Sequence, residues 1–263
     1  MSSTDLDASL PRFSRIDWNA STDEAAWIDA AATAITTALR AALDGGGEVH
    51  LLLSGGTTPA PVYQRLAAGE LDWSRVVVGL VDDRDVEPDA QGSNARLIRE
   101  TLLQNAAAAA RFELLRGPRQ SIEDAVRAAN TRWRARESLF VENASREDTQ
   151  KQRRRLIVVL GMGDDGHTAS LFPGALNLAA AFASTEPYAA IDASGCKVAG
   201  AYPHRISLTP HGLAQSTQRL LLIRGAGKRA VFEHALQAGD AREMPIRAAI
   251  DLPGAALLVH WCP

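Results

Sequence analysis

The sequence predicts an α/β fold in which helices cover both faces of a mostly parallel sheet. Stretches with apolar residues at helical spacing alternate along the chain with short apolar runs. Several of these runs, among them residues 156–160, are apolar at every position, which is typical of parallel strands buried on both faces. No change in composition marks a linker, so we expect residues 1–263 to form a single domain, with residues 1–20 as a peripheral N-terminal arm.

Recognisable sequence signals bound the expected helices and strands. Residues 22–43 are rich in alanine with apolar residues at helical spacing, and the three glycines at 45–47 end this helix. The most uniform apolar run, residues 156–160, is expected in the centre of the sheet. Further helices are expected at residues 60–68, 93–105, 121–140 and 228–237, and further strands at 48–53, 75–82, 112–115, 205–209, 219–223 and 256–261.

The charge and the cysteine content argue against several classes of protein. A formal net charge of −3 and a pI of about 6.1 disfavour a dedicated nucleic-acid-binding protein, which normally carries a basic patch. The two cysteines, Cys196 and Cys262, lack metal-ligand spacing, so we expect no metal site and a reducing compartment. The chain shows neither signal-peptide features nor an apolar run of membrane-spanning length. We expect a cytoplasmic protein without nucleic-acid or membrane partners, present as a monomer or small homo-oligomer.

A segment rich in glycine and hydroxyl groups follows the expected strand at 48–53 and opens a helix. Its residues are Ser54, Gly55, Gly56, Thr57, Thr58 and Pro59. Two glycines let the backbone approach an anion closely, and a helix N-terminus supplies free N–H groups and a positive dipole end. The segment is not a Walker A loop, because no Lys-Ser or Lys-Thr follows the glycines. It predicts a phosphate-binding loop, and the alternative is an ordinary strand–helix turn.

A charged segment lies at the end of the next buried strand. Asp82, Asp83 and Arg84 close the run that starts at residue 75, and Ser93 and Asn94 then begin a helix. Charged side chains beside a buried strand are costly unless they are exposed or paired. Arg84 suits bidentate binding of a phosphate. The alternative is a solvated loop with internal ion pairs.

A glycine-rich turn follows the central run and carries an aspartate and a histidine two residues apart. The turn reads Gly161-Met-Gly-Asp-Asp-Gly-His167, and its spacing fits neither a dinucleotide fingerprint nor a calcium loop. Histidine titrates near neutral pH and suits general-base work, and a carboxylate can orient its ring. We expect His167 to be the base and Asp165 its partner, although the sequence does not separate Asp165 from Asp164. Residues 168–170 are expected to begin a helix; the alternative is a capping aspartate and a structural histidine.

Two further cations stand next to expected strands. Arg205 begins the run at 205–209, and Lys228 lies in Gly225-Ala-Gly-Lys228, which joins a strand to a helix. Because ligands of parallel sheets bind at the carboxyl ends of the strands, either cation can complete an anion pocket there. The alternative for each is a surface charge. The remaining histidines have no partner at motif spacing and are expected to be structural or exposed: His50, His204, His211, His234 and His260.

In their order and spacing, these motifs resemble the 6-phosphogluconolactonase family. The resemblance extends over roughly residues 25 to 261, and its most discriminating stretch is Asp-Gly-His-Thr-Ala-Ser-Leu-Phe-Pro at 165–173. The chain departs from the family pattern at two places. Asp83 stands where the family often has glutamate. Residues 200–204 replace a Lys-Pro-Pro segment found in many members, which leaves Lys197 as the nearest lysine.

The resemblance implies a Rossmann-like fold of the deaminase/ribose-5-phosphate isomerase type and a hydrolase of the oxidative pentose phosphate pathway. The implied reaction is hydrolysis of a phosphosugar lactone, 6-phospho-D-glucono-1,5-lactone, to 6-phosphogluconate without a cofactor. His167 would take a proton from the attacking water, oriented by Asp165, and backbone N–H groups of the glycine turn would stabilise the oxyanion. The expected substrate-binding residues are Ser54, Gly55, Gly56, Thr57, Arg84, Arg205 and Lys228.

Two alternative functions follow from the same residues. The wider superfamily includes glucosamine-6-phosphate deaminase, which shares the Asp-Gly-His core. A deaminase or isomerase would need a carboxylate base, for which Asp82 or Asp83 is available. The other alternative is a non-catalytic protein that binds a sugar phosphate.

Overall fold

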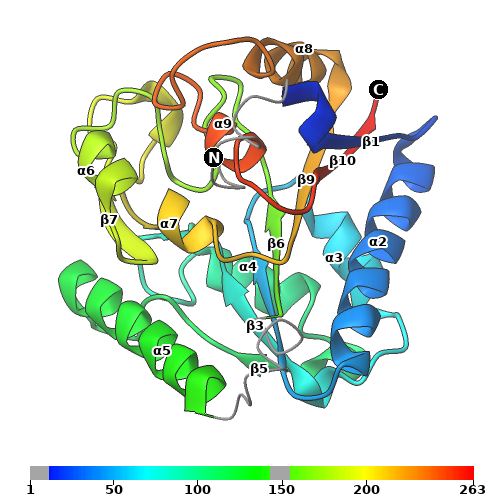
Figure 1. The fold of residues 1–263 in the computed structure, drawn as a ribbon. Helices are drawn as coiled ribbons and strands as arrows, with labels where there is room; N and C mark the ends of the chain where they lie inside the picture. Colours follow the sequence, from blue (N-terminus) through cyan, green and yellow to red (C-terminus); the bar gives the residue numbers. More distant parts are fainter. Residues whose placement is uncertain (1–11, 143–154) are drawn as a thin grey trace.

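The structure is a computed structural model that describes residues 12–142 and 155–263 (Figure 1). The strands are β1 (Ile16–Ala20), β2 (Val49–Leu53), β3 (Val76–Leu80), β4 (Asp82–Arg84), β5 (Arg111–Phe112), β6 (Leu156–Leu160), β7 (Tyr188–Asp192), β8 (His204–Leu208), β9 (Gln218–Arg224) and β10 (Leu257–Cys262). The α-helices are α2 (Glu24–Asp44), α3 (Ala60–Ala67), α4 (Asn94–Thr101), α5 (Ile122–Glu142), α6 (Leu178–Ala183), α7 (Pro210–Leu213), α8 (Gly225–Ala235) and α9 (Arg247–Ile250). Short 3-10 helices are η1 (Arg12–Arg15), η2 (Trp73–Arg75), η3 (Asn105–Ala109) and η4 (Lys197–Ala199).

The main sheet is parallel throughout the described part of the chain. It has seven strands in the order β1-β10-β9-β6-β2-β3-β5, and every neighbouring pair runs parallel. In Figure 1, α2 and α3 lie on one side of this sheet, and the segments around α6, α7 and β7 lie on the other. The predicted α/β class with a mostly parallel sheet is therefore confirmed.

The strand order reverses direction between β2 and β6. From β2 the chain adds β3 and β5 on one side, and it then returns to add β6, β9 and β10 on the other. The loops that leave two such neighbouring strands diverge, which opens a crevice at their carboxyl ends. The glycine-rich segments at 54–59 and 161–167 leave β2 and β6 at this reversal point.

A small antiparallel sheet accounts for the clearest difference from the sequence prediction. The predicted strand at 205–209 exists as β8, but it pairs antiparallel with β4 and β7 in a separate three-stranded sheet. Asp82–Arg84, expected at the end of a parallel strand, forms β4 of this second sheet. Val81 joins the two sheets, because it donates its N–H to the carbonyl of Leu53 (2.9 Å) and its carbonyl accepts from Leu208 N (2.8 Å).

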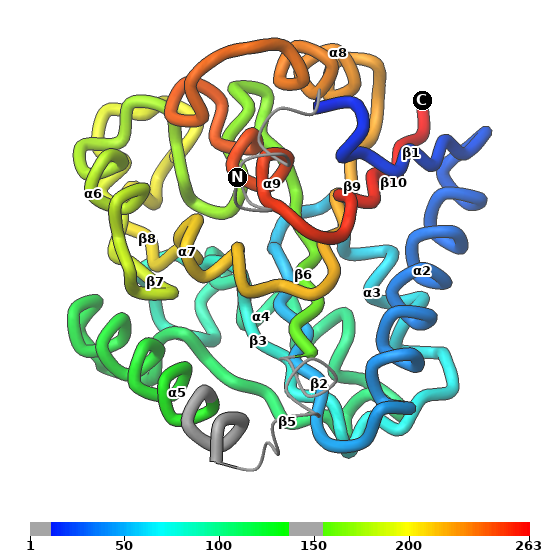
Figure 2. Tube along the Cα trace, viewed as in Figure 1, coloured from blue at the N-terminus to red at the C-terminus, as the bar shows by residue number. Residues whose placement is uncertain are grey.

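The N-terminal arm expected at residues 1–20 is only partly described. Residues 1–11 lie outside the described residues. Ile16–Ala20 forms β1, which pairs with β10 at the edge of the main sheet and so belongs to the sheet rather than to an arm. Figure 2 shows β1 beside β10, close to the C-terminus.

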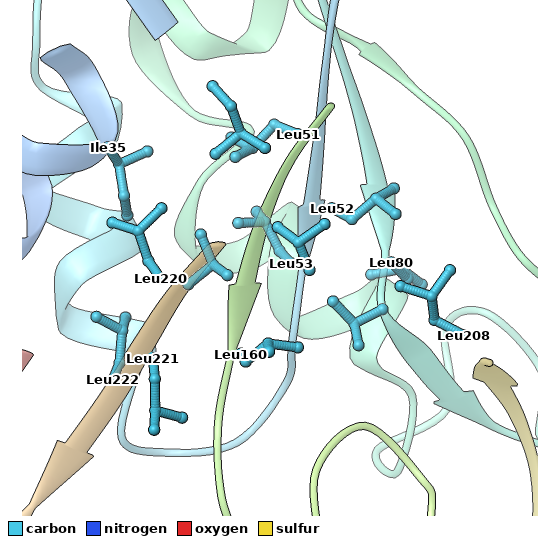
Figure 3. Close-up of a cluster of buried hydrophobic side chains, with 14 of the residues drawn as sticks. Ile35, Leu51, Leu52, Leu53, Leu80, Leu160, Leu208, Leu220, Leu221 and Leu222 are labelled. Atoms are coloured by element: carbon cyan, nitrogen blue, oxygen red, sulfur yellow. The ribbon is translucent and has the colours of Figure 1, made fainter. Parts of the chain in front are cut away.

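The main core cluster includes the central strands, α2 on one face of the sheet and residues of α5 and β7 elsewhere around it. Asp23 caps α2 by accepting a hydrogen bond from Ala26 N (2.9 Å), and Gly46 and Gly47, both with positive φ, follow its end. Figure 3 shows Ile35 of α2 facing the leucines of β9 and β2. None of the helices in the described part of the chain has the length and apolarity that crossing a membrane requires.

His260 is a buried histidine of β10 and supplies a stability prediction. Its side chain is 2 % exposed, and neither ring nitrogen has a hydrogen-bond partner within the described residues. Burial lowers its pKa below the ordinary 6.5, with Asp17 opposing the shift. The unfolded chain therefore binds the proton first, and the free energy of unfolding should fall as pH drops below 6.5 toward the lowered pKa, by at most about 1.4 kcal/mol per pH unit.

Urea unfolding followed between about pH 5 and pH 8 measures this slope. The variant His260→Leu should have a shallower dependence than the unmodified chain. His211→Gln is the matched control, because His211 is exposed and should leave the slope unchanged. Equal slopes in His260→Leu and the unmodified chain would contradict the prediction.

Candidate active site

A cavity of about 300 Å³ opens at the carboxyl ends of β2, β6 and β9. The strand reversal between β2 and β6 places it there, and β4 and β8 of the small sheet close its other side. Asp165 does not line the cavity but contacts His167, which does. The other sequence-predicted residues all line it: Ser54, Gly55, Gly56, Thr57, Arg84, Arg205 and Lys228.

A residue of α3 holds the start of the loop after β2 in place. The Tyr63 hydroxyl donates to the carbonyl of Ser54 (2.8 Å), which fixes the start of the loop. Gly56 adopts a φ of +104°, a conformation that favours glycine. A Cβ at Gly55 would overlap the side chain of Asn94, so the loop and α4 pack too closely for any side chain there. The Ser54 hydroxyl is buried in the cavity wall without a partner among the described residues, and is thus available to a ligand.

The two aspartates of β4 accept hydrogen bonds from the segments around the cavity. Asp83 is 4 % exposed, and its carboxylate accepts from Asn94 N (2.7 Å) and Ser93 Oγ (3.0 Å) at the start of α4. Burial raises the pKa of Asp83, opposed by these backbone hydrogen bonds. The shorter acid at this position therefore still reaches the N-terminus of α4. Asp82 lines the cavity and accepts from Ser170 Oγ (2.6 Å).

Arg84 and Arg205 lie directly opposite each other on the antiparallel strands β4 and β8. Like charges in this position repel each other, and neither arginine forms an ion pair within the described residues. Arg205 is 5 % exposed, and burial lowers its pKa; the charge of Asp82 opposes this shift and the charge of Arg84 adds to it. A bound anion would relieve both the repulsion and the burial cost, so this pair is suited to binding a phosphate.

The histidine and its acid form a hydrogen-bonded pair on the loop after β6. His167 Nδ1 lies 2.6 Å from Asp165 Oδ1, and the backbone N–H of His167 donates to the same oxygen (3.1 Å). Burial raises the pKa of Asp165, but the hydrogen bond and charge of His167 outweigh it and hold that pKa below its ordinary value. The Phe172 ring packs 4.5 Å from the imidazole. Because Nδ1 faces Asp165, Nε2 is the nitrogen left for substrate.

The neighbouring Asp164 has a different partner. Its carboxylate lies 2.9 Å from Lys228 Nζ, in the first turn of α8. The two adjacent acids thus have different partners: Asp165 contacts His167, and Asp164 contacts Lys228. Lys197, the lysine nearest the altered segment, lies in η4 and does not line the cavity.

The prediction that residues 168–170 begin a helix is wrong. Thr168 and Leu171 instead form an antiparallel bridge, and α6 begins only at residue 178. Thr168 Oγ1 donates to the carbonyl of Gly161 (2.8 Å), which closes the turn, and Ala169 has a φ of +52°. Gly163 N–H donates to the His167 carbonyl (2.8 Å) and so is not free to stabilise an oxyanion.

Several residues of the cavity were not predicted from the sequence. Arg224 lines it, pairs with Glu24 of α2 and stacks 5.7 Å from the ring of Trp27. Its position directly before the predicted Gly225-x-x-Lys228 motif was the available signal. Phe172 and Val198 also line the cavity. Within the described residues, no group of three or more His, Cys, Asp or Glu side chains is arranged to hold a metal ion.

Comparisons with known proteins identify the family of the chain. The family described as glucosamine-6-phosphate isomerases/6-phosphogluconolactonase matches residues 22–258. A 6-phosphogluconolactonase from Xylella fastidiosa is 49 % identical over 82 % of this chain and 83 % of its own length. One from Rhizobium meliloti is 36 % identical over 89 % and 94 %. The crystal structure of a 6-phosphogluconolactonase from Shewanella baltica has a TM-score of 0.80 at 34 % identity, covering 94 % of this chain and 97 % of that one. The chain belongs to the glucosamine-6-phosphate isomerase/6-phosphogluconolactonase family.

Proposed function

We propose that the chain is a 6-phosphogluconolactonase, which hydrolyses 6-phospho-D-glucono-1,5-lactone to 6-phosphogluconate in the oxidative pentose phosphate pathway of the cytoplasm. The observation that carries the proposal is the placement of the His167–Asp165 pair and the Arg84–Arg205 pair around one cavity. A base and an anion site in the same cavity suit a substrate with a hydrolysable carbonyl at one end and a phosphate at the other.

The phosphate of the substrate would be held by the loop after β2 and by the cavity cations. The N-terminus of α3 and the hydroxyls of Ser54 and Thr57 offer hydrogen-bond donors to a dianion. Arg84, Arg205 and Lys228 supply the positive charge. Binding this remote group fixes the lactone carbonyl beside His167, so phosphate binding contributes to catalysis.

In the proposed reaction, His167 Nε2 removes a proton from water as the water oxygen bonds to C1 of the lactone. The tetrahedral oxyanion then collapses, the bond between C1 and the ring oxygen breaks, and the imidazolium returns the proton to that oxygen. Asp165 stabilises the imidazolium between the two steps. Every step uses water and side chains of this chain, so the reaction needs no cofactor.

The decisive experiment compares two substrates. Purified protein is mixed with freshly prepared 6-phosphogluconolactone, and the spontaneous opening of the lactone is subtracted. Glucosamine 6-phosphate is assayed in parallel for ammonia release, because a deaminase would use a carboxylate base such as Asp82. We expect lactone hydrolysis and no ammonia. Ammonia release without lactonase activity, or binding of 6-phosphogluconate without turnover of the lactone, would contradict the proposal.

Arg84→Met tests the proposed phosphate site. Loss of a charged hydrogen-bond donor to phosphate should raise KM for the lactone by about tenfold or more, with a smaller change in kcat. Initial rates over a range of lactone concentrations separate the two constants. Arg127→Met is the control, because Arg127 is largely exposed on α5 and does not line the cavity. An unchanged KM in Arg84→Met would remove Arg84 from the phosphate site.

A further inference from the structure

Tyr202 contacts Arg84 and Arg205, two of the arginines that line the cavity. Its ring lies under Arg84, with the guanidinium carbon 5.9 Å from the ring centroid. Its backbone carbonyl accepts a hydrogen bond from Arg205 Nε, and the carbonyl of Ala199 accepts one from Arg205 Nη2 (2.9 Å). One residue thus lies against both members of the cross-strand arginine pair.

The Tyr202 ring is partly exposed and packs on one side against Gly92. A Cβ at Gly92 would come 2.5 Å from the ring carbon that carries the hydroxyl and 2.8 Å from the hydroxyl oxygen. The carbonyl of Gly92 also accepts a hydrogen bond from Arg84 Nη1. The Arg84 guanidinium is therefore held between a backbone carbonyl and an aromatic face, while its Nε is buried without a partner among the described residues.

Such a support is needed because the two arginines repel each other. A long, flexible side chain beside a like charge turns away from it unless other contacts hold it, and ordering such a side chain on binding weakens affinity. The Tyr202 ring attracts the cation electrostatically and limits its rotamers before the ligand arrives. Tyr202 lies in the segment 200–204, where the chain departs from the Lys-Pro-Pro pattern of its family.

We propose that Tyr202 is a positioning residue that holds Arg84 beside Arg205 in a geometry ready for the substrate phosphate. This inference rests on the proposed function, because it assigns the arginine pair to a phosphate. Tyr202 acts through Arg84 and is given no contact with the reacting carbonyl. It should therefore affect binding of the phosphate end and leave the chemical step nearly unchanged.

Two substitutions separate the ring from the hydroxyl. Tyr202→Ala should raise KM for 6-phosphogluconolactone by about fivefold, the size of one cation–π contact at a partly exposed site, with kcat within about twofold. Tyr202→Phe keeps the ring and should keep the KM of the unmodified chain. Leu176→Ala is the matched control, because Leu176 is an exposed apolar side chain outside the cavity wall. A KM unchanged in Tyr202→Ala, or a loss confined to kcat, would overturn the proposal.

A double-mutant cycle tests whether Tyr202 acts through Arg84. In the background of Arg84→Met, the further change Tyr202→Ala should have almost no effect on KM, since the cation that the ring supports is gone. Additive effects of the two substitutions would overturn the proposal.

Calorimetry with inorganic phosphate repeats the comparison without turnover. Tyr202→Ala should weaken the Kd for phosphate by a similar factor, and Tyr202→Phe should not. An inactive unmodified chain would refute the lactonase proposal and leave this measurement intact, whereas an active chain with equal phosphate Kd in both variants would refute the role of Tyr202 alone.

Discussion

Replacing His167 with alanine is expected to lower kcat for 6-phosphogluconolactone by about 10²–10⁴-fold, the usual effect of losing a general base. The imidazole lines the cavity and its Nδ1 is bound to Asp165, so Nε2 is placed to take the proton of the attacking water. KM should change little, because the proposed phosphate contacts come from other residues. Initial rates on fresh lactone, corrected for spontaneous opening, give both constants.

Two further variants test whether the loss of kcat is specific to the His167–Asp165 pair. His211→Ala should retain the kcat of the unmodified chain, since His211 is an exposed residue of α7 whose ring contacts Gln215. Asp165→Asn keeps a side chain of the same shape but loses the negative charge that stabilises the imidazolium, so kcat should again fall. Thermal unfolding checks that each variant is folded. A folded His167→Ala protein with full lactonase activity would exclude His167 as the base.

The parts of the fold that the sequence predicted are the strands buried on both faces. β2, β3 and β6 are buried at every position, and continuous apolar runs of this kind reveal themselves without any knowledge of their neighbours. Two strands that it missed, β1 and β7, are partly exposed. β1 is an edge strand, and β7 has buried and half-buried positions in no strict order, so neither produces a long apolar run. β1 forms only by pairing with β10, at the far end of the sequence.

The candidate site also has a part that the sequence predicts and a part that it does not. The loops after β2 and β6 carry local signals, namely glycines, hydroxyls and a histidine directly after a buried strand. The opposition of Arg84 and Arg205 arises only from the pairing of β4 with β8, which no local pattern encodes. The different partners of Asp164 and Asp165 depend on the backbone of one turn and on the position of α8. The ring of Tyr202 is likewise placed by tertiary contacts alone.

Gly163→Ala is expected to lower kcat by about 10²-fold although the substitution adds only a methyl group. A Cβ at this position would overlap the His167 ring and lie 2.6 Å from Asp165 Oδ1. Neither side chain can keep its place, because the carboxylate and the ring are already in hydrogen-bonding contact with each other. Displacing a catalytic group by about 1 Å costs a factor of this order, while the phosphate contacts and hence KM should be preserved.

The control for this prediction is Gly227→Ala. Gly227 lies in α8, where an added Cβ would meet nothing within 4 Å, and alanine is the better helix former. It should retain full activity and match or exceed the thermal stability of the unmodified chain. A folded Gly163→Ala protein with the kcat of the Gly227→Ala control would show that catalysis does not need the hydrogen-bonded geometry of His167 and Asp165. The expected loss of kcat would instead show that residue 163 must be glycine for His167 to hold its catalytic position.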